Sequence, residues 1–158
     1  MSLVPIIMGS RSDLAHAEAI AEGLRTFGIA SEIRVASAHK AARYLLDLLA
    51  EYEADGQPTV YVTVAGRSNA LSGLVDANVT APVIACPPYS DRFGGADLFS
   101  SLRMPSGVAP AVVLEPAAAA VLVAKILALG DPALRERIAQ AQSQATETII
   151  AADKALQA

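Results

Sequence analysis

One of the chain's two histidines, His39, lies in a short polar segment that reads Ser37-Ala38-His39-Lys40. An imidazole has an ordinary pKa of about 6.5, so it can both accept and donate a proton at neutral pH. Ser37 adds a hydroxyl group, and Lys40 adds a cation suited to a phosphate or a carboxylate. The segment therefore predicts acid–base chemistry on an anionic substrate, with an idle surface histidine as the alternative. The other histidine, His16, is predicted to be structural.

A second polar segment spans residues 8–13 and reads Met-Gly-Ser-Arg-Ser-Asp. Gly9 permits a tight turn, and Ser10 and Ser12 offer hydroxyl groups. A helix that begins after this segment presents free N–H groups and the positive end of its dipole, which together bind anions. Asp13 is suited to the hydroxyl groups of a ribose, with capping of the helix by Ser12 or Asp13 as the alternative. The segment matches neither a P-loop nor a dinucleotide-binding fingerprint.

The third polar segment, residues 65–73, follows a β-branched run and reads Ala-Gly-Arg-Ser-Asn-Ala-Leu-Ser-Gly. Gly66 lets the backbone approach a ligand. Ser68 and Asn69 place neutral hydrogen-bonding groups where a helix is expected to begin. Such groups suit a neutral or weakly polar substrate such as CO2, or the carboxylate that CO2 becomes. In the alternative interpretation, Asn69 only caps the helix.

Two further segments carry weaker signals. Cys86 is the chain's one cysteine, so the chain can form neither an internal disulfide nor a cysteine-rich metal site. No histidine is close to Cys86 in sequence, and we expect its side chain to be part of the packing. Residues 94–107 combine a glycine pair, a short helix and a Met-Pro turn. This segment is expected either to cover a pocket or to form a subunit contact.

The elements that must position these segments alternate regularly along the chain. Strands are predicted at residues 3–8, 31–36, 59–64, 82–86 and 111–114, with helices at 14–27, 42–52, 69–77, 96–102 and 116–129. Such alternation implies right-handed crossovers and a parallel sheet covered on both faces, which is a three-layer α/β/α sandwich. Ligands bind outside the carboxyl ends of such strands. The three polar segments should therefore meet at one edge of the sheet.

The C-terminal part of the chain predicts one long helix at about residues 132–156, with a thin apolar stripe rich in alanine. A stripe of this kind packs closely but buries little area, so we expect the helix to lie against a neighbouring subunit. Residues 1–158 are interpreted as a single domain whose core covers about residues 3–129.

Composition limits the possible partners of the protein. The chain is 53% hydrophobic and 18% charged, which argues against disorder and favours a homo-oligomer. Its net charge is −4 and its basic residues are scattered, which disfavours nucleic acid as a partner. The longest apolar stretch, 117–129, is interrupted by Lys125 and is shorter than the roughly 20 residues of a membrane span. With no signal peptide at the N-terminus, we expect a cytoplasmic protein.

Together, the three polar segments resemble the aminoimidazole ribonucleotide (AIR) carboxylase family of purine synthesis, over residues 6 to about 129. The first two motifs are common to both classes of that family. In the mutase class the third reads Ala-Gly-x-Ala-Ala-His-Leu-Pro-Gly-Met, with a histidine at the position of Ala70, and arginine usually replaces Lys40. This chain is instead similar to the class that uses CO2 directly, also at residues 86–88 and 100–107. Within that class it most resembles the bacterial single-domain enzymes.

The resemblance implies a flavodoxin-like fold, a homo-oligomer (an octamer or a tetramer), and sites near subunit boundaries. It implies no metal and no cofactor. His39 is then the catalytic residue, which manages the proton at imidazole C4. Ser68 and Asn69 hold CO2 or the new carboxylate in a loop shaped by Arg67. The residues that bind the ribose and the 5′-phosphate are Gly9, Ser10, Ser12, Asp13, Ser37 and Lys40.

The aminoimidazole ring is enamine-like, so its C4 can attack CO2 without a metal, biotin or ATP when the two reactants are held in register. We expect His39 to remove the C4 proton afterwards and to return it during decarboxylation. One alternative is mutase chemistry, in which a carboxylated N5 intermediate rearranges on the same fold. Another is a non-catalytic flavin- or nucleotide-binding module. With no Trp, four Tyr and three Phe, the chain has few rings to stack on a flavin.

Overall fold

The computed structural model describes residues 3–56 and 60–157. The start of the strand predicted at 59–64 and the two ends of the predicted domain lie outside these residues. The strands are β1 (Leu3–Met8), β2 (Ala30–Val35), β3 (Tyr61–Val64), β4 (Val83–Ala85) and β5 (Ala111–Val112). The α-helices are α1 (Leu14–Thr26), α2 (Ala42–Ala54), α3 (Ala70–Asp76), α4 (Phe99–Leu102), α5 (Pro116–Leu127) and α6 (Pro132–Leu156). Short 3-10 helices are η1 (Arg11–Asp13) and η2 (Arg92–Leu98).

The sheet has the strand order β2-β1-β3-β4-β5, and every pair of neighbouring strands is parallel. This order is that of the flavodoxin-like fold and confirms the predicted fold class. The chain adds β2 on one side of β1 and then β3, β4 and β5 on the other side. This reversal leaves a crevice outside the carboxyl ends of β1 and β3. The first and third polar segments begin at these two strand ends, and the second begins after β2, the strand next to β1.

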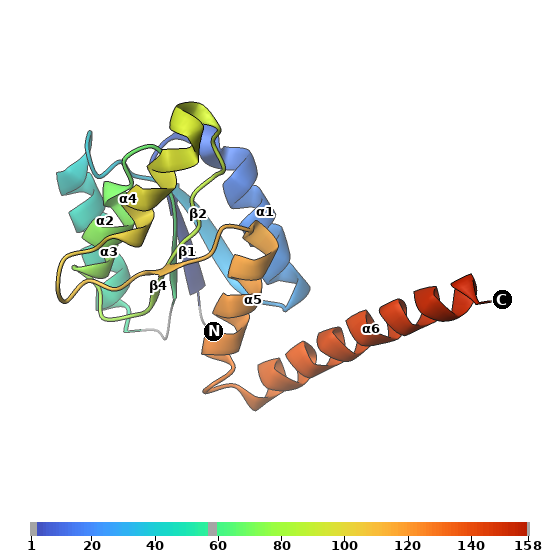
Figure 1. The fold of residues 1–158 in the computed structure, drawn as a ribbon. Coiled ribbons are helices and arrows are strands. Elements are labelled where there is room, and N and C mark those ends of the chain that lie inside the picture. The colour runs from blue at the N-terminus through green and yellow to red at the C-terminus, as the bar shows by residue number, and fades with distance from the viewer. Residues whose placement is uncertain (1–2, 57–59, 158) are drawn as a thin grey trace.

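Two helical layers cover the sheet, with α1 and α5 on one face and α2 and α3 on the other (Figure 1). Within β1, Ile6 packs with the α1 and α5 side chains, and its neighbour Ile7 packs with those of α2 and α3. Both isoleucines are fully buried, as expected for a central strand of a parallel sheet. The apolar run of β1 therefore supports both cores at once.

Helices α1 and α5 approach each other closely at Gly23. A Cβ atom on this residue would lie 2.7 Å from the Cβ of Ala120, closer than two such atoms approach in proteins. The glycine and the alanine thus allow the two helices to touch along their small residues. Gly28, with a φ of 70°, then ends the α1 region in the left-handed conformation that favours glycine.

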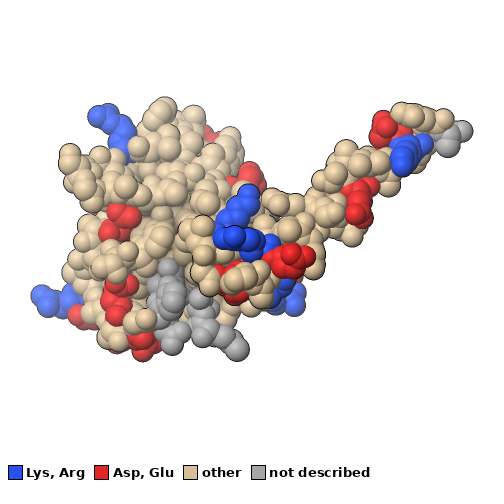
Figure 2. All heavy atoms as spheres, turned by 90° about the horizontal axis from the view of Figure 1, so that it is seen from below, with Lys and Arg blue, Asp and Glu red and all other residues tan. Residues whose placement is uncertain are grey.

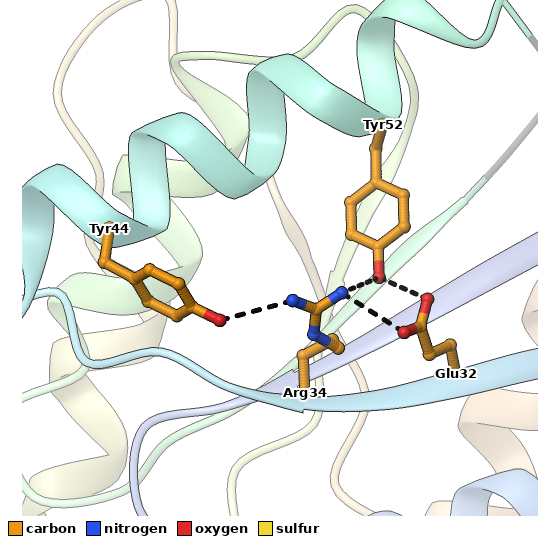
Figure 3. Close-up of polar contacts among 4 residues, drawn as sticks. All are labelled: Glu32, Arg34, Tyr44 and Tyr52. Carbon is orange, nitrogen blue, oxygen red and sulfur yellow. Dashed lines mark hydrogen bonds and ion pairs between the residues drawn. The ribbon is translucent and has the colours of Figure 1, made fainter.

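At the edge of the sheet, a polar network joins β2 to α2 (Figure 3). The Arg34 guanidinium donates hydrogen bonds to Glu32 at 3.1 Å and to the Tyr44 hydroxyl at 3.2 Å. The Tyr52 hydroxyl donates to the other Glu32 oxygen at 2.7 Å. Burial, together with the Glu32 carboxylate, raises the pKa of Tyr52 to about 12. These bonds fix α2, and hence the loop before it, against the edge strand.

Helix α6 extends away from the rest of the molecule (Figure 1). Only Leu134 and Ile138, near its start, are buried in the core, and the Asp131 carboxylate caps its first turn by accepting from the Leu134 N–H at 3.0 Å. Farther along, Ile149 is 71% exposed. Both signs of charge are distributed along the helix (Figure 2). Packing of α6 on another subunit stays a prediction. Within the described residues, no helix combines the length and apolar character needed to cross a bilayer.

Candidate active site

The loops after β1, β2 and β3 surround a cavity of about 540 Å³. Backbone hydrogen bonds continue past the strand ends and hold these loops side by side. The Gly9 N–H donates to the Val64 carbonyl at 2.9 Å, and the Ala36 N–H donates to the Met8 carbonyl at 3.0 Å. The cavity is lined by nine of the predicted site residues: Gly9, Ser10, Ser12, Asp13, Ser37, His39, Lys40, Arg67 and Ser68.

In the first loop, Ser10 rather than Ser12 or Asp13 supplies the cap. Its Oγ accepts from the Ser12 N–H at 3.3 Å, at the start of η1. Asp13 occupies the cap position of α1, but among the described residues its carboxylate makes no capping bond. The Ser12 hydroxyl lies 2.9 Å from Ser10 Oγ and 3.3 Å from Asp13 Oδ1. The hydroxyl groups and the carboxylate therefore remain at the cavity wall, where they can meet a ribose or a phosphate.

The second loop is folded back on itself by Ser37. Its Oγ accepts from the Lys40 N–H at 3.2 Å, and its carbonyl accepts from the Ala41 N–H at 2.9 Å. With the loop in this conformation, the exposed residues His39 and Lys40 line the cavity. An imidazole and an ammonium group are thus presented from a loop that the backbone keeps in one shape.

In the third loop, Ser68 and Arg67 line the cavity, but Asn69 does not. Asn69 is only 4% exposed and caps α3, with its Oδ1 accepting from the Ser72 N–H at 3.1 Å. Its Nδ2 donates to Ser101 Oγ at 2.9 Å. The structure thus places Asn69 as the capping alternative predicts, behind the loop, and a contact between Asn69 and the substrate stays a prediction.

A fourth wall comes from the segment after β4, where the sequence interpretation missed Tyr89, Ser90 and Arg92, while Asp97 belongs to the segment 94–107 expected to cover a pocket or form a subunit contact. Tyr89, Ser90, Arg92 and Asp97 line the cavity there. The signal was available, because these residues follow the carboxyl end of a predicted strand. The segment also contains three consecutive residues in the left-handed region: Phe93 (φ 55°), Gly94 (φ 62°) and Gly95 (φ 77°). The backbone of η2 is therefore non-helical at these three residues, and helical conformation follows over the predicted 96–102.

The charges around the cavity suit an anionic ligand. Three cationic side chains, Lys40, Arg67 and Arg92, line it together with two carboxylates, Asp13 and Asp97. A local excess of cations in a chain of net charge −4 is consistent with a phosphate-bearing substrate. In the part of the chain that the structure describes, no cluster of three His, Cys, Asp or Glu side chains is arranged to hold a metal ion.

The structure also brings His16 to Cys86, which lie far apart in the sequence. The His16 Nε2 atom is 3.4 Å from Cys86 Sγ. Burial raises the pKa of the Cys86 thiol to about 12 and lowers the pKa of His16. The pair is therefore a neutral thiol beside a neutral imidazole, rather than an activated thiolate. This arrangement agrees with the packing role expected for Cys86 and the structural role expected for His16.

Comparisons with known proteins agree with this geometry. A family model described as AIR carboxylase matches residues 3–148. The phosphoribosylaminoimidazole carboxylase of Archaeoglobus fulgidus is 57% identical over 151 residues, which cover 96% of this chain and 83% of the relative. The enzyme of the same name from Treponema denticola is 53% identical over 154 residues, covering 98% and 97%. A crystal structure of Treponema denticola PurE superposes with a TM-score of 0.98 at 51% identity, over 100% of both chains.

Proposed function

The chain belongs to the AIR carboxylase family, and we propose that it reversibly carboxylates 5-aminoimidazole ribonucleotide at C4 with CO2, in purine synthesis. The observation that carries this proposal is the cavity itself. It is lined by one histidine, His39, by the first loop and by Ser68. An imidazole, a loop that carries hydroxyl groups and a carboxylate, and a further neutral hydroxyl group thus share one cavity.

The ribonucleotide is held by the first two loops in this proposal. The Asp13 carboxylate binds the ribose hydroxyl groups, while Ser10, Ser12 and Ser37 offer hydroxyl groups to the 5′-phosphate. Lys40 supplies the neutralising charge, since a cation strengthens a hydrogen bond to an anionic oxygen. The backbone bond of Gly9 to Val64 keeps this loop beside the third one. The imidazole ring of the substrate then lies between His39 and Ser68.

The reaction forms one carbon–carbon bond and releases one proton. Electrons of the enamine-like ring attack the carbon of CO2, and C4 becomes tetrahedral, bearing both a proton and a carboxylate. His39 accepts that proton as the C4–H electrons restore the aromatic ring. In the reverse direction His39 returns the proton to C4 and CO2 departs. The protein supplies positioning and proton transfer, and each contributes orders of magnitude to rate.

Replacing His39 with asparagine tests the assignment. We expect turnover to fall by roughly 10²- to 10⁴-fold, the usual contribution of a general base, with ribonucleotide affinity nearly unchanged. His16→Asn is the matched control, because His16 is the chain's other histidine and lies outside the cavity lining. Near-normal turnover of His39→Asn would remove His39 from the mechanism.

The choice of CO2 over the mutase reaction rests on the third loop. The resemblance places the second histidine of the mutase class at the position of Ala70, which here is the first residue of α3. Alanine cannot transfer a proton, so no side chain at this position can assist the migration of a carboxyl group. Tyr89 is the one aromatic ring other than His39 among the described lining residues, which gives the flavin-binding alternative little support.

The assembly we propose is a homo-oligomer in the cytoplasm, an octamer or a tetramer. Large apolar side chains near the cavity are exposed in the single chain, among them Phe93 at 85% and Phe99 at 65%. Helix α6 also buries little of its surface. Light scattering on the purified chain tests this proposal, and a monomer at micromolar concentration would contradict it.

A further inference from the structure

The loop proposed to hold CO2 is tied to a distant segment, residues 97–101, by several hydrogen bonds. The Arg67 N–H donates to Asp97 Oδ2 at 3.1 Å. The Asn69 N–H donates to Ser100 Oγ at 2.9 Å, and the Asn69 side chain donates to Ser101 Oγ at 2.9 Å. These bonds span about thirty residues of sequence, and we refer to Asp97, Ser100 and Ser101 as the clamp.

The Ser100 hydroxyl adds a further connection. Its oxygen lies 3.1 Å from the Arg67 carbonyl and 2.7 Å from the Asp97 carbonyl, and its one proton can serve either acceptor. The Arg67 carbonyl belongs to the peptide that precedes Ser68, and the Asn69 N–H belongs to the peptide that follows it. One side chain of the clamp therefore contacts both peptides that flank Ser68.

The loop needs such contacts because its backbone is strained. Arg67 has a φ of 61°, in the left-handed region that disfavours residues bearing a Cβ atom. An exposed arginine does not hold this conformation by itself, and strained residues persist when the surrounding structure fixes them. The hydrogen bond that the Arg67 N–H donates to the Asp97 carboxylate is such a contact.

We propose that the clamp positions Ser68 for CO2, so that Asp97, Ser100 and Ser101 are positioning residues of the reaction. This inference rests on the proposed function. CO2 is a small neutral molecule with few atoms to bind, so its capture depends on donors that are already in place. The ribonucleotide, by contrast, is held by its phosphate and ribose on the first two loops. Loosening the clamp should therefore weaken the use of CO2 far more than that of the ribonucleotide.

Asp97→Ala in the full-length enzyme provides the test. We expect the KM for CO2 to rise about tenfold, as for the loss of one charge-assisted hydrogen bond, while the KM for the ribonucleotide changes less than about twofold. Asp76→Ala is the matched control, because the Asp76 carboxylate accepts from the Ala109 N–H at 2.7 Å and also joins two distant segments, outside the cavity lining. The control should leave both KM values unchanged.

Ser100 provides a second test that does not remove a charge. Ser100→Ala should also raise the KM for CO2 selectively. Ser100→Thr keeps the hydroxyl group and should therefore have a KM for CO2 close to that of the wild type. An effect on folding alone would lower the amount of active enzyme and leave both KM values as they are.

Three outcomes would overturn the inference. If the wild-type enzyme turns over normally and the KM for CO2 is unchanged in both Asp97→Ala and Ser100→Ala, the clamp does not position Ser68, while the proposed function stands. A rise confined to the KM for the ribonucleotide would instead make Asp97 a substrate ligand. A wild-type enzyme that does not carboxylate the ribonucleotide would overturn the proposed function and this inference together.

Discussion

Replacing Asn69 with alanine separates a structural role for this residue from a role on the substrate. The variant loses the cap on the Ser72 N–H, which costs about 1 kcal/mol in the free energy of unfolding. It also leaves the Ser101 hydroxyl, in a residue only 2% exposed, without the donor it now has. That loss adds about 1 kcal/mol. We therefore expect Asn69→Ala to lower the free energy of unfolding by about 2 kcal/mol.

Equilibrium unfolding in urea, at one fixed protein concentration, measures this loss. Asn69→Asp keeps an acceptor for the Ser72 N–H and places a negative charge at a helix N-terminus, so it should lose about half as much. Asn78→Ala, an exposed site whose side chain donates to the Leu74 carbonyl, should change stability by less than about 0.5 kcal/mol. Wild-type stability of Asn69→Ala combined with lost turnover would refute the capping role and make Asn69 a substrate ligand.

Three further predictions concern the protein's stability and its thiol. Gly23→Ala should lower the free energy of unfolding by about 1–2 kcal/mol, because the cost of the steric overlap with Ala120 exceeds the gain in helix propensity. Adding Ala120→Gly should restore part of the lost stability. Calorimetry that shows Gly23→Ala to be more stable than the wild type would contradict this prediction. The Cys86 thiol, with its pKa raised to about 12 by burial, should react slowly with a disulfide reagent at about pH 8 until the protein is unfolded, and immediate full reaction of the native protein would refute it. Burial raises the pKa of Glu53, but the hydrogen bonds that its carboxylate accepts together hold this pKa below the ordinary 4.5, so stability should decline as the pH falls below that value. Glu53→Gln should reduce the decline, and an unchanged pH profile would contradict the assignment.

Most of the fold was predictable because the signal for each element is local. The apolar run of β1 and the helical spacing of α1 are read from neighbouring residues, and parallel strands bring their carboxyl ends together at one edge. The positions of His39 and Ser68 at one cavity follow from that rule. Identification of the family from the same loops is confirmed by the matching family model.

Contacts between distant segments could not be predicted from the sequence. The two interpretations of Asn69 were equivalent in sequence, and its bonds to Ser72 and Ser101 depend on the folded arrangement of these segments. The approach of His16 to Cys86 depends on how α1 lies over the end of β4. Arg92 and Asp97 reach the cavity through a segment whose path depends on three consecutive left-handed residues. The position of α6 relative to other subunits depends on contacts outside a single chain.

The most direct test of the account is the reaction itself, measured with the purified enzyme in the absence of ATP. Incubated with 5-aminoimidazole ribonucleotide, the enzyme should form the C4-carboxylated product at a rate that rises and saturates with CO2. In a separate reaction with the N5-carboxylated ribonucleotide, the enzyme should form no more product than is expected from the part of that substrate that has already decomposed. Efficient conversion of the N5-carboxylated substrate, with no response to CO2, would contradict the account and make the enzyme a mutase.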